Sequence, residues 1–200
     1  MLVRFDEGNW ILKEWRYPKG IEELLFQAGN DDVIGREWAV RELGRCVEAP
    51  AADEITDALT GLAAEDPFWA VRAASIEVLA ALHGPGQGDA AGAQKAARAG
   101  EGSRTEQILR AAALDESSRV RRAAIRLLGE AGDPSLTTFF RDRFPRDDSY
   151  QVQAEVLRAI GRSKDASQLQ FLKDTSEMES PEDVIRKAAV WAMAEISGGR

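Results

Sequence analysis

A pattern that ends in a small residue returns five times along the chain, and this internal repeat is the feature that most constrains the fold. The spacings between successive end points are 36, 49, 32 and 33 residues. The five end points, called anchors below, are Gly44, Ala80, Gly129, Gly161 and Ala194. Periods of this size indicate stacked supersecondary units. One such unit cannot bury its own apolar face, so neighbouring units must pack against each other.

The apolar residues of each unit fall on one stripe of an α-helix. They stand nine, five, four and one residues before the anchor, which are the helical positions i, i+4, i+5 and i+8. The position four before the anchor holds Val40, Ile76, Ile125, Leu157 and Val190. Residues seven and three before the anchor are mostly polar and are predicted to lie on the opposite face.

A shorter amphipathic segment precedes each of these helices, and a turn containing Asp joins the two. The turn at Asp66-Pro67 shows the chemistry, since Asp caps helices and Pro fits the first helical position. The expected first helices are Ile21–Ala28, Glu54–Ala64, Thr105–Leu114, Leu136–Phe144 and Ser167–Asp174. The sequence therefore predicts an all-α protein, an α-α superhelix (solenoid) of about five helical hairpins.

This pattern resembles HEAT and HEAT-like repeats over about residues 20–197. The resemblance is carried by the Asp turn, the pairs Val71-Arg72 and Val120-Arg121, the small residues at mid-helix and the closing Leu-Gly. It implies a solenoid but leaves the function open, because one scaffold of this kind serves many roles.

Two segments depart from the repeat. Residues 1–20 alternate bulky and polar side chains before a boundary at Pro18-Lys19-Gly20, which is typical of strands. We expect a short β stub there, left from a preceding β-domain, with residues 21–200 forming the repeat domain. Residues 84–104 contain six Gly, six Ala and no large apolar residue. Such a composition cannot offset its ordering entropy, so this segment is predicted to be a flexible insert.

A more specific resemblance is found at the start of the chain. It is carried by Phe5, Asp6 and Gly8, by Ile11-Leu12-Lys13, by Ile21-Glu22-Glu23-Leu24-Leu25, and by Arg36, Ala39 and Leu43. These residues resemble zinc aminopeptidases of the aminopeptidase N type, at the junction between a β-sandwich and the C-terminal helical domain.

The aminopeptidase resemblance implies a non-catalytic domain that braces a catalytic domain and restricts peptide access to its chamber. Its partners would be the catalytic and β-domains of the same parent chain, and the zinc would belong to that catalytic domain. The aromatic side chains expected to contact the neighbouring domain are Phe5, Trp10, Trp15 and Tyr17.

Residues that could perform chemistry are scarce. His83 is the only histidine, and a His-Glu-x-x-His zinc site needs two. Cys46 is the only cysteine, which excludes a disulfide within the chain and favours a small core residue over a nucleophile. We therefore expect no catalytic residue, no cofactor and no metal ligand in this chain.

The charge balance narrows the classes of partner. The net charge is −8, with 11 basic and 18 acidic residues in 1–104 and 15 and 16 in 105–200. Neither half is basic, which argues against binding to nucleic acid or to anionic membranes. No apolar run approaches the length of a membrane span. We expect a soluble, cytoplasmic protein whose partner is a peptide or a protein.

Two columns of side chains recur beside the apolar stripe. The column eight before the anchor contains Arg36, Arg72, Arg121 and Arg186. We predict an internal ladder in which each Arg pairs with an Asp of an adjacent turn, and the alternative is a row of anion contacts. The candidate partner surface consists of residues that stand seven or three positions before an anchor. These residues are Arg41, Glu77, Arg122, Arg126, Arg158 and Trp191. The competing interpretation is a solvated helix face.

Three functions remain open at this point. The first is the aminopeptidase domain, and the second is a free-standing HEAT adaptor that binds another protein. The third is a HEAT-fold DNA-repair glycosylase. The net negative charge argues against this function, whereas the basic group Arg122, Arg126 and Arg158 supports it.

Overall fold

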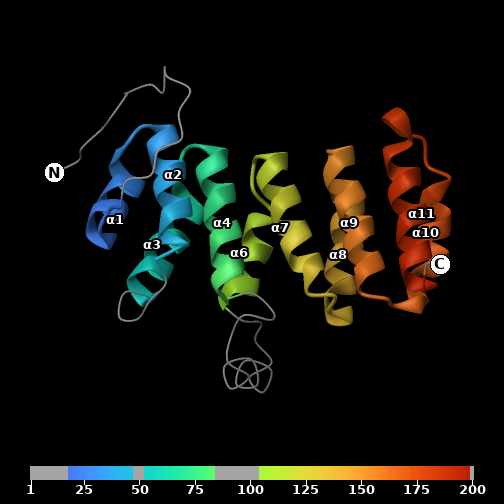
Figure 1. Cartoon of the computed structure of the whole chain (residues 1–200). Helices are drawn as coiled ribbons and strands as arrows, with labels where there is room; N and C mark the ends of the chain where they lie inside the picture. Colours follow the sequence, from blue (N-terminus) through green and yellow to red (C-terminus); the bar gives the residue numbers. More distant parts are fainter. Residues whose placement is uncertain (1–17, 47–51, 84–103, 199–200) are drawn as a thin grey trace. The chain divides into compact units, whose positions relative to one another are not determined.

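The computed structural model describes residues 18–46, 52–83 and 104–198, and these residues contain α-helices, short 3-10 helices and no strand (Figure 1). The all-α class and the helical hairpins are thus confirmed. The predicted β stub, with Phe5, Trp10, Trp15 and Tyr17, lies outside the described residues, as do residues 84–103 of the predicted insert. The chain divides into two compact units, Met1–His83 and Gly84–Arg200.

The first unit contains two hairpins. Its helices are α1 (Ile21–Asn30), α2 (Val33–Leu43), α3 (Ala52–Glu65) and α4 (Trp69–His83). α1 packs on α2, α3 packs on α4, and the two second helices α2 and α4 pack on each other. Leu24, Leu43, Ile55, Ile76 and Leu79 are fully buried between them.

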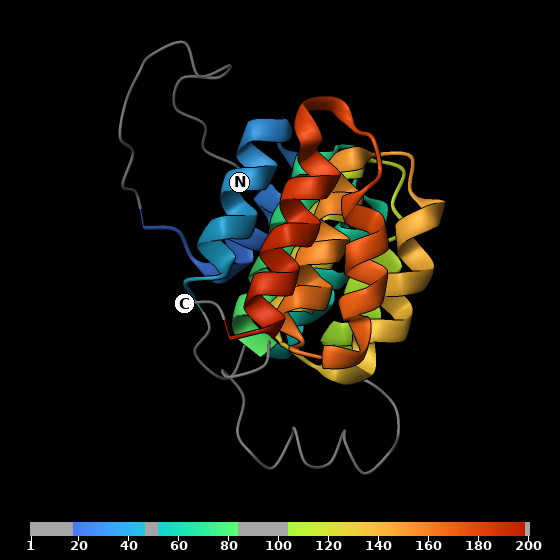
Figure 2. The same ribbon diagram turned by 90° about the vertical axis from the view of Figure 1, so that its right-hand side faces the viewer.

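The second unit contains three hairpins in two layers. Its α-helices are α6 (Arg104–Ala112), α7 (Ser118–Glu130), α8 (Thr137–Arg143), α9 (Tyr150–Arg162), α10 (Leu169–Ser176) and α11 (Val184–Ile196). Short 3-10 helices cover Pro134–Leu136, Phe144–Arg146, Ala166–Gln168 and Pro181–Asp183. α9 packs between α7 and α11 in one layer, and α8 and α10 lie on the other side of α9 and α11 (Figure 2). Arg104 is the first residue of α6, whereas the prediction placed it in the insert as its last residue.

In three of the turns, an Asp residue sets where the second helix begins. The Asp66 Oδ1 atom accepts a hydrogen bond from the Phe68 amide at 2.8 Å, and Asp115 and Asp147 make the same bond two residues on, at 2.7 and 3.0 Å. This Asx turn uses the two residues after the Asp. α4 therefore begins at Trp69, and the prediction that Pro67 is its first residue is wrong.

The small anchor residue explains how closely the second helices approach. A Cβ atom added to Gly161 would lie 2.7 Å from the Ala192 Cα atom, and one added to Gly129 would lie 2.6 Å from the Ala159 Cβ atom. Gly44 faces Val78 in the same manner, at 2.8 Å from the Val78 Cγ1 atom. Each anchor Gly thus packs on the residue two before the next anchor.

Two pairs of the predicted arginine ladder are present, one in each unit. Arg36 of α2 binds Asp66 through its Nε and Nη2 atoms at 2.9 and 3.2 Å. Arg121 of α7 binds Asp147 in the same bidentate manner, at 2.8 and 2.9 Å. A guanidinium and a carboxylate in this fork geometry form a strong, directional pair. Each pair links one second helix to the turn of the next hairpin.

The same arginines also close their own turns. The Nη1 atoms of Arg36, Arg72 and Arg121 donate to the main-chain oxygens of Asp31, Asp66 and Asp115 at 2.9, 2.8 and 2.9 Å. Gln153 fills this column in the fourth hairpin, and its amide donates to the Asp147 main-chain oxygen at 2.8 Å. A neutral amide therefore preserves the turn contact.

Two predictions about the last hairpin are wrong. Arg186 is exposed, and it binds the Asp183 carboxylate of its own turn and the Ser176 main-chain oxygen instead of joining the ladder. Val190 was placed in the core stripe but is 53% exposed. α11 packs on α9 and α10, and no helix of the described residues covers these two positions.

Candidate protein-binding surface

The structure separates the residues of the predicted partner surface into two groups. Arg41 of α2 and Glu77 of α4 lie in the first unit, where the Arg41 Nη1 atom and the Glu77 Oε2 atom are 3.6 Å apart. Arg41 also bonds to Glu37 one turn earlier. These charges neutralise one another, so the first unit offers little net charge at this position.

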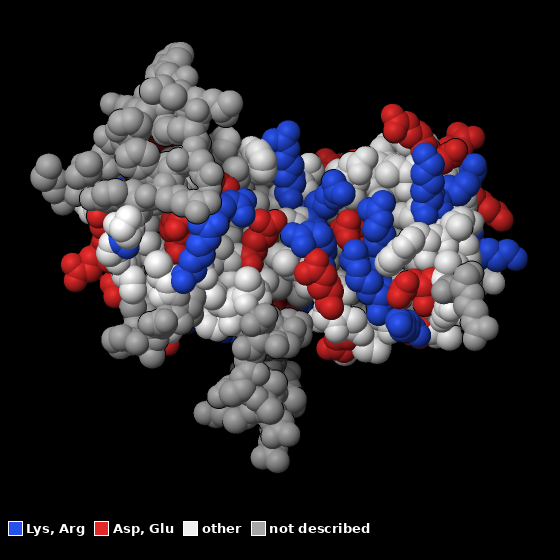
Figure 3. Space-filling model, viewed as in Figure 1, with Lys and Arg blue, Asp and Glu red and all other residues white. Residues whose placement is uncertain are grey.

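The second unit contains the other group. Arg122 and Arg126 lie on α7, Arg158 lies on α9, and Trp191 lies on α11. The surface of these three helices carries many Lys and Arg side chains, with a few Asp and Glu side chains between them (Figure 3). We call Arg122, Arg126, Glu155, Arg158, Arg162 and Trp191 together the arginine surface.

Glu155 is the centre of this surface, and the sequence prediction missed it. Its side chain is only 4% exposed, and its carboxylate lies 3.2 Å from Arg158 Nη1, 3.1 Å from Arg162 Nη1 and 3.8 Å from Arg122 Nε. A buried carboxylate is tolerated only when it is paired, and here three guanidinium groups from two helices share it. Glu155 thereby links α7 to α9.

A signal for Glu155 was present in the sequence. It stands six residues before its anchor, a position that Ala74, Ala123 and Ala188 occupy in three other hairpins. The first hairpin has Trp38 there, and Glu155 is the one charged residue of this column, which points to a local, specific arrangement. The prediction considered only the columns seven and three before the anchor.

Trp191 extends the arginine surface onto α11. It is 41% exposed, which is unusual for so large an aromatic side chain, and the Arg162 guanidinium carbon lies 5.7 Å from the centre of its ring. This distance permits a cation–π interaction. Arg162, which the prediction also missed, therefore connects the Glu155 carboxylate to the exposed indole.

The balance of charge on the arginine surface is positive. The surface contains four positively charged arginines and one negatively charged residue, Glu155. A second carboxylate, Glu130, lies at the edge and bonds to Arg126 at 2.8 Å. Arg122 is half exposed and presents its guanidinium to solvent. Arginine keeps its charge at any physiological pH, so the surface stays cationic.

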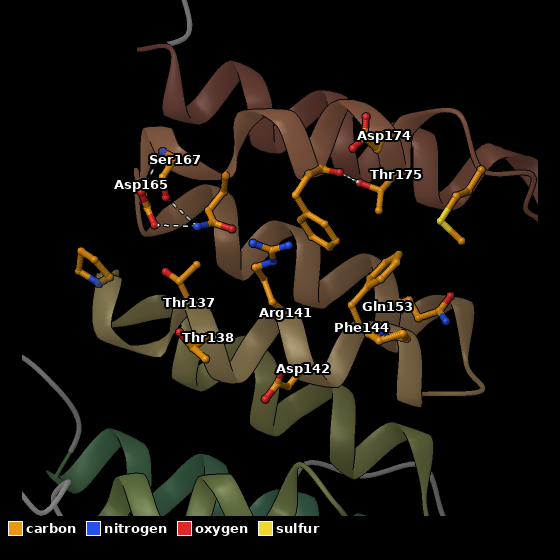
Figure 4. Close-up of a pocket in the computed structure, with 15 residues that line it drawn as sticks. Thr137, Thr138, Arg141, Asp142, Phe144, Gln153, Asp165, Ser167, Asp174 and Thr175 are labelled. Atoms are coloured by element: carbon orange, nitrogen blue, oxygen red, sulfur yellow. Dashed lines mark hydrogen bonds between the residues drawn. The ribbon is translucent and has the colours of Figure 1, made fainter.

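A groove lies elsewhere on the second unit, between α8 and α10 (Figure 4). Its volume is about 1020 Å³, and Phe144 and Phe171 pack edge to face in it at 5.6 Å. The Arg141 guanidinium lies over the Phe171 ring at 4.8 Å. Within the described residues, the buried Thr137 Oγ1 and Gln168 Oε1 atoms at this groove have no hydrogen-bond partner.

His83 and Cys46 are the two side chains that the sequence analysis considered for chemistry. His83, at the end of α4, is exposed and lies 2.8 Å from the Thr56 hydroxyl. Cys46 is half-buried after α2 and forms no disulfide. In ranges 18–46, 52–83 and 104–198, no three His, Cys, Asp or Glu side chains are grouped so that they could hold a metal ion. No helix in the same ranges is long and apolar enough to cross a membrane.

Comparison with known families agrees with the hairpin architecture. A profile of HEAT repeats matches residues 56–149 and again residues 105–194, which together span more than half of the chain. The chain therefore belongs to the HEAT-repeat family. No curated protein matches it.

Proposed function

We propose that this chain is a non-catalytic HEAT-repeat scaffold that binds a protein partner through the arginine surface of α7, α9 and α11. The observation that carries this proposal is the group of three arginines that contact the buried Glu155, next to an exposed Trp191. Arg and Trp are the residues most enriched among the energetically dominant positions of protein interfaces.

The contacts within the arginine surface favour binding over a merely solvated face. Side chains that are already held by Glu155 lose less conformational entropy when a partner arrives. A solvated helix face does not require a buried carboxylate that orders three guanidinium groups. It also does not require a large exposed aromatic ring beside them.

Site-specific photo-crosslinking tests this proposal in cells that express the chain. A photoreactive amino acid replaces Lys187, which is exposed on α11 one turn before Trp191. The matched control replaces Lys173, which is exposed on α10 in the other layer. We expect protein adducts from position 187, and their loss when Trp191→Ala and Arg158→Glu are added. Equal adducts from both positions, or none from 187, would contradict the proposal.

A second candidate is that the partner is the rest of a zinc aminopeptidase chain. The resemblance at Ile21–Leu25, Arg36, Ala39 and Leu43 supports it, and its other residues lie outside the described ranges. In that case the chain would brace the catalytic domain and restrict access of peptides to it. The crosslinks from position 187 would then form within one longer polypeptide, and the same gene would encode a His-Glu-x-x-His motif upstream.

The DNA-glycosylase alternative has less support. The arginine surface contains carboxylates at its centre and at its edge, and the chain carries a net charge of −8. A phosphate backbone needs a continuous row of cations. We expect no binding to duplex DNA with an abasic site in a fluorescence anisotropy titration at physiological salt.

A further inference from the structure

The chemistry of the partner can be inferred from the arginine surface, and this inference rests on the proposed function. We infer that the surface recognises an acidic segment of a protein, and that Glu155 is a positioning residue which holds the guanidinium groups in place for the partner's carboxylates.

The donors of the arginine surface exceed what Glu155 can accept. A guanidinium group has five N–H donors in a rigid fork, whereas a carboxylate has two oxygen atoms. Arg158 and Arg162 approach Glu155 through one nitrogen atom each, and Arg122 through its Nε atom at a longer distance of 3.8 Å. Most donors of these three residues therefore remain for a ligand. Planar, bidentate acceptors such as carboxylates fit this fork geometry.

The position of Glu155 makes it suited to orient these groups. It is buried between α7 and α9, and it contacts Arg122 of one helix and Arg158 and Arg162 of the other. Its negative charge keeps the mutually repelling guanidinium groups close together. Without Glu155, the three side chains would separate and populate more rotamers. A ligand would then have to order them, at a cost in conformational entropy.

An acidic protein segment fits this surface better than a nucleic acid does. The positive charge is local, since residues 105–200 carry 15 basic and 16 acidic side chains overall. Screening in physiological salt limits attraction to about 8 Å, so a short acidic segment gains from the arginines without meeting the surrounding carboxylates. A long polyanion would meet them. Trp191 adds an apolar platform that a protein side chain can cover.

Two isosteric variants separate positioning from simple charge attraction. Glu155→Gln and Glu130→Gln each remove one negative charge from the same surface. Glu130 lies at the exposed edge beside Arg126, whereas Glu155 lies at the buried centre. If charge alone mattered, both variants would bind an acidic peptide more tightly. If Glu155 positions the arginines, Glu155→Gln binds more weakly although its surface is more positive.

The assay is fluorescence anisotropy of a labelled peptide of alternating Asp and Ser with one central Leu, titrated with the full chain. We expect saturable binding that weakens with added salt, and no binding of the matching Lys peptide or of duplex DNA. Glu155→Gln should weaken binding by about twofold to fivefold, the range expected from the cost of ordering one side chain on binding. Glu130→Gln should tighten binding slightly, as expected for an exposed ion pair. Arg158→Lys, which keeps the charge but loses the fork, should also weaken binding.

Thermal melting of each variant shows whether Glu155→Gln still folds. If it does not, Arg158→Lys and Arg122→Gln test the same surface, and Lys173→Gln on α10 serves as the charge-matched control that should bind like the parent chain. Tighter binding by Glu155→Gln would overturn the positioning role. No difference between the Asp and Lys peptides would overturn the acidic partner, while crosslinks from position 187 to a non-acidic protein would leave the proposed function standing.

Discussion

At the scale of single residues, Asp147 combines more roles than any other carboxylate of the ladder. It accepts a bidentate pair from Arg121, a bond from Arg143 at 2.9 Å and the Ser149 amide, and its side chain is fully buried. Burial alone would raise the pKa of Asp147, but the bonds from Arg121, Ser149 and Arg143 outweigh it and hold that pKa below its ordinary value. The Asp147 bond in turn raises the pKa of Arg121.

We predict that Asp147→Asn lowers the free energy of unfolding by about 3 kcal/mol at neutral pH, because it removes the buried carboxylate that pairs with the mostly covered Arg121 and Arg143 side chains. A depressed pKa contributes stability above the unfolded value of about 3.9, and that stability is lost as pH falls through the folded pKa. The difference between parent and variant should therefore shrink below pH ~4. Urea unfolding followed by circular dichroism at neutral and acid pH measures it.

The neighbouring Asp148 provides the control for this prediction. It also contacts Arg121, at 2.8 Å, but its side chain is 93% exposed. Asp148→Asn should change stability by less than about 0.5 kcal/mol, since exposed ion pairs contribute little. Equal losses from both substitutions would show that the buried pair is not what stabilises the turn.

At the scale of helices, the anchor glycines decide how closely α7, α9 and α11 can pack. A side chain at Gly161 would collide with the backbone of α11 at Ala192, and α11 would have to move away from α9. The ladder and the arginine surface both depend on side chains that reach from one second helix to the next hairpin. Close packing at the anchors therefore also sets the geometry of the binding surface.

We predict that Gly161→Val destabilises the second unit by about 2 kcal/mol through overpacking. Gly61, in the middle of α3, is the matched control because nothing lies within 4 Å of an added Cβ atom there. Gly61→Ala should stabilise the protein by about 0.5–1 kcal/mol, since Ala has the higher helix propensity. Thermal melts of the two variants should shift in opposite directions. A shift of Gly161→Val toward higher temperature would refute the packing argument.

At the scale of the molecule, the chain is two compact units, each with its own core and its own bidentate arginine pair. We predict that residues 104–200 fold by themselves, because three hairpins can cover each other's apolar faces. Circular dichroism should show a helical protein with a cooperative thermal transition, and the acidic peptide should bind to it as to the full chain. A non-cooperative melt would mean that the second unit needs the first.

The amino-acid sequence alone was sufficient to predict the repeat, the helical class and the ladder pairs of Arg36 and Arg121. These follow from local rules: the apolar stripe has the period of a helix, Asp favours the turn, and a small anchor residue marks a close approach. That Arg36 and Arg121 pair with an Asp of an adjacent turn could be predicted, because both residue types recur at a fixed distance from the anchors, and the structure identifies these partners as Asp66 and Asp147.

The arginine surface was only partly predictable. Arg122, Arg126, Arg158 and Trp191 were identified from their columns, but Glu155 and Arg162 were not, because their roles depend on which side chains of α7, α9 and α11 meet. The exposure of Val190 and Arg186 likewise could not be read from their columns, because burial depends on which described helices pack against α11. Periodicity determines which face a residue occupies, whereas packing between helices decides which charges share a partner, because that pairing involves residues distant in the chain.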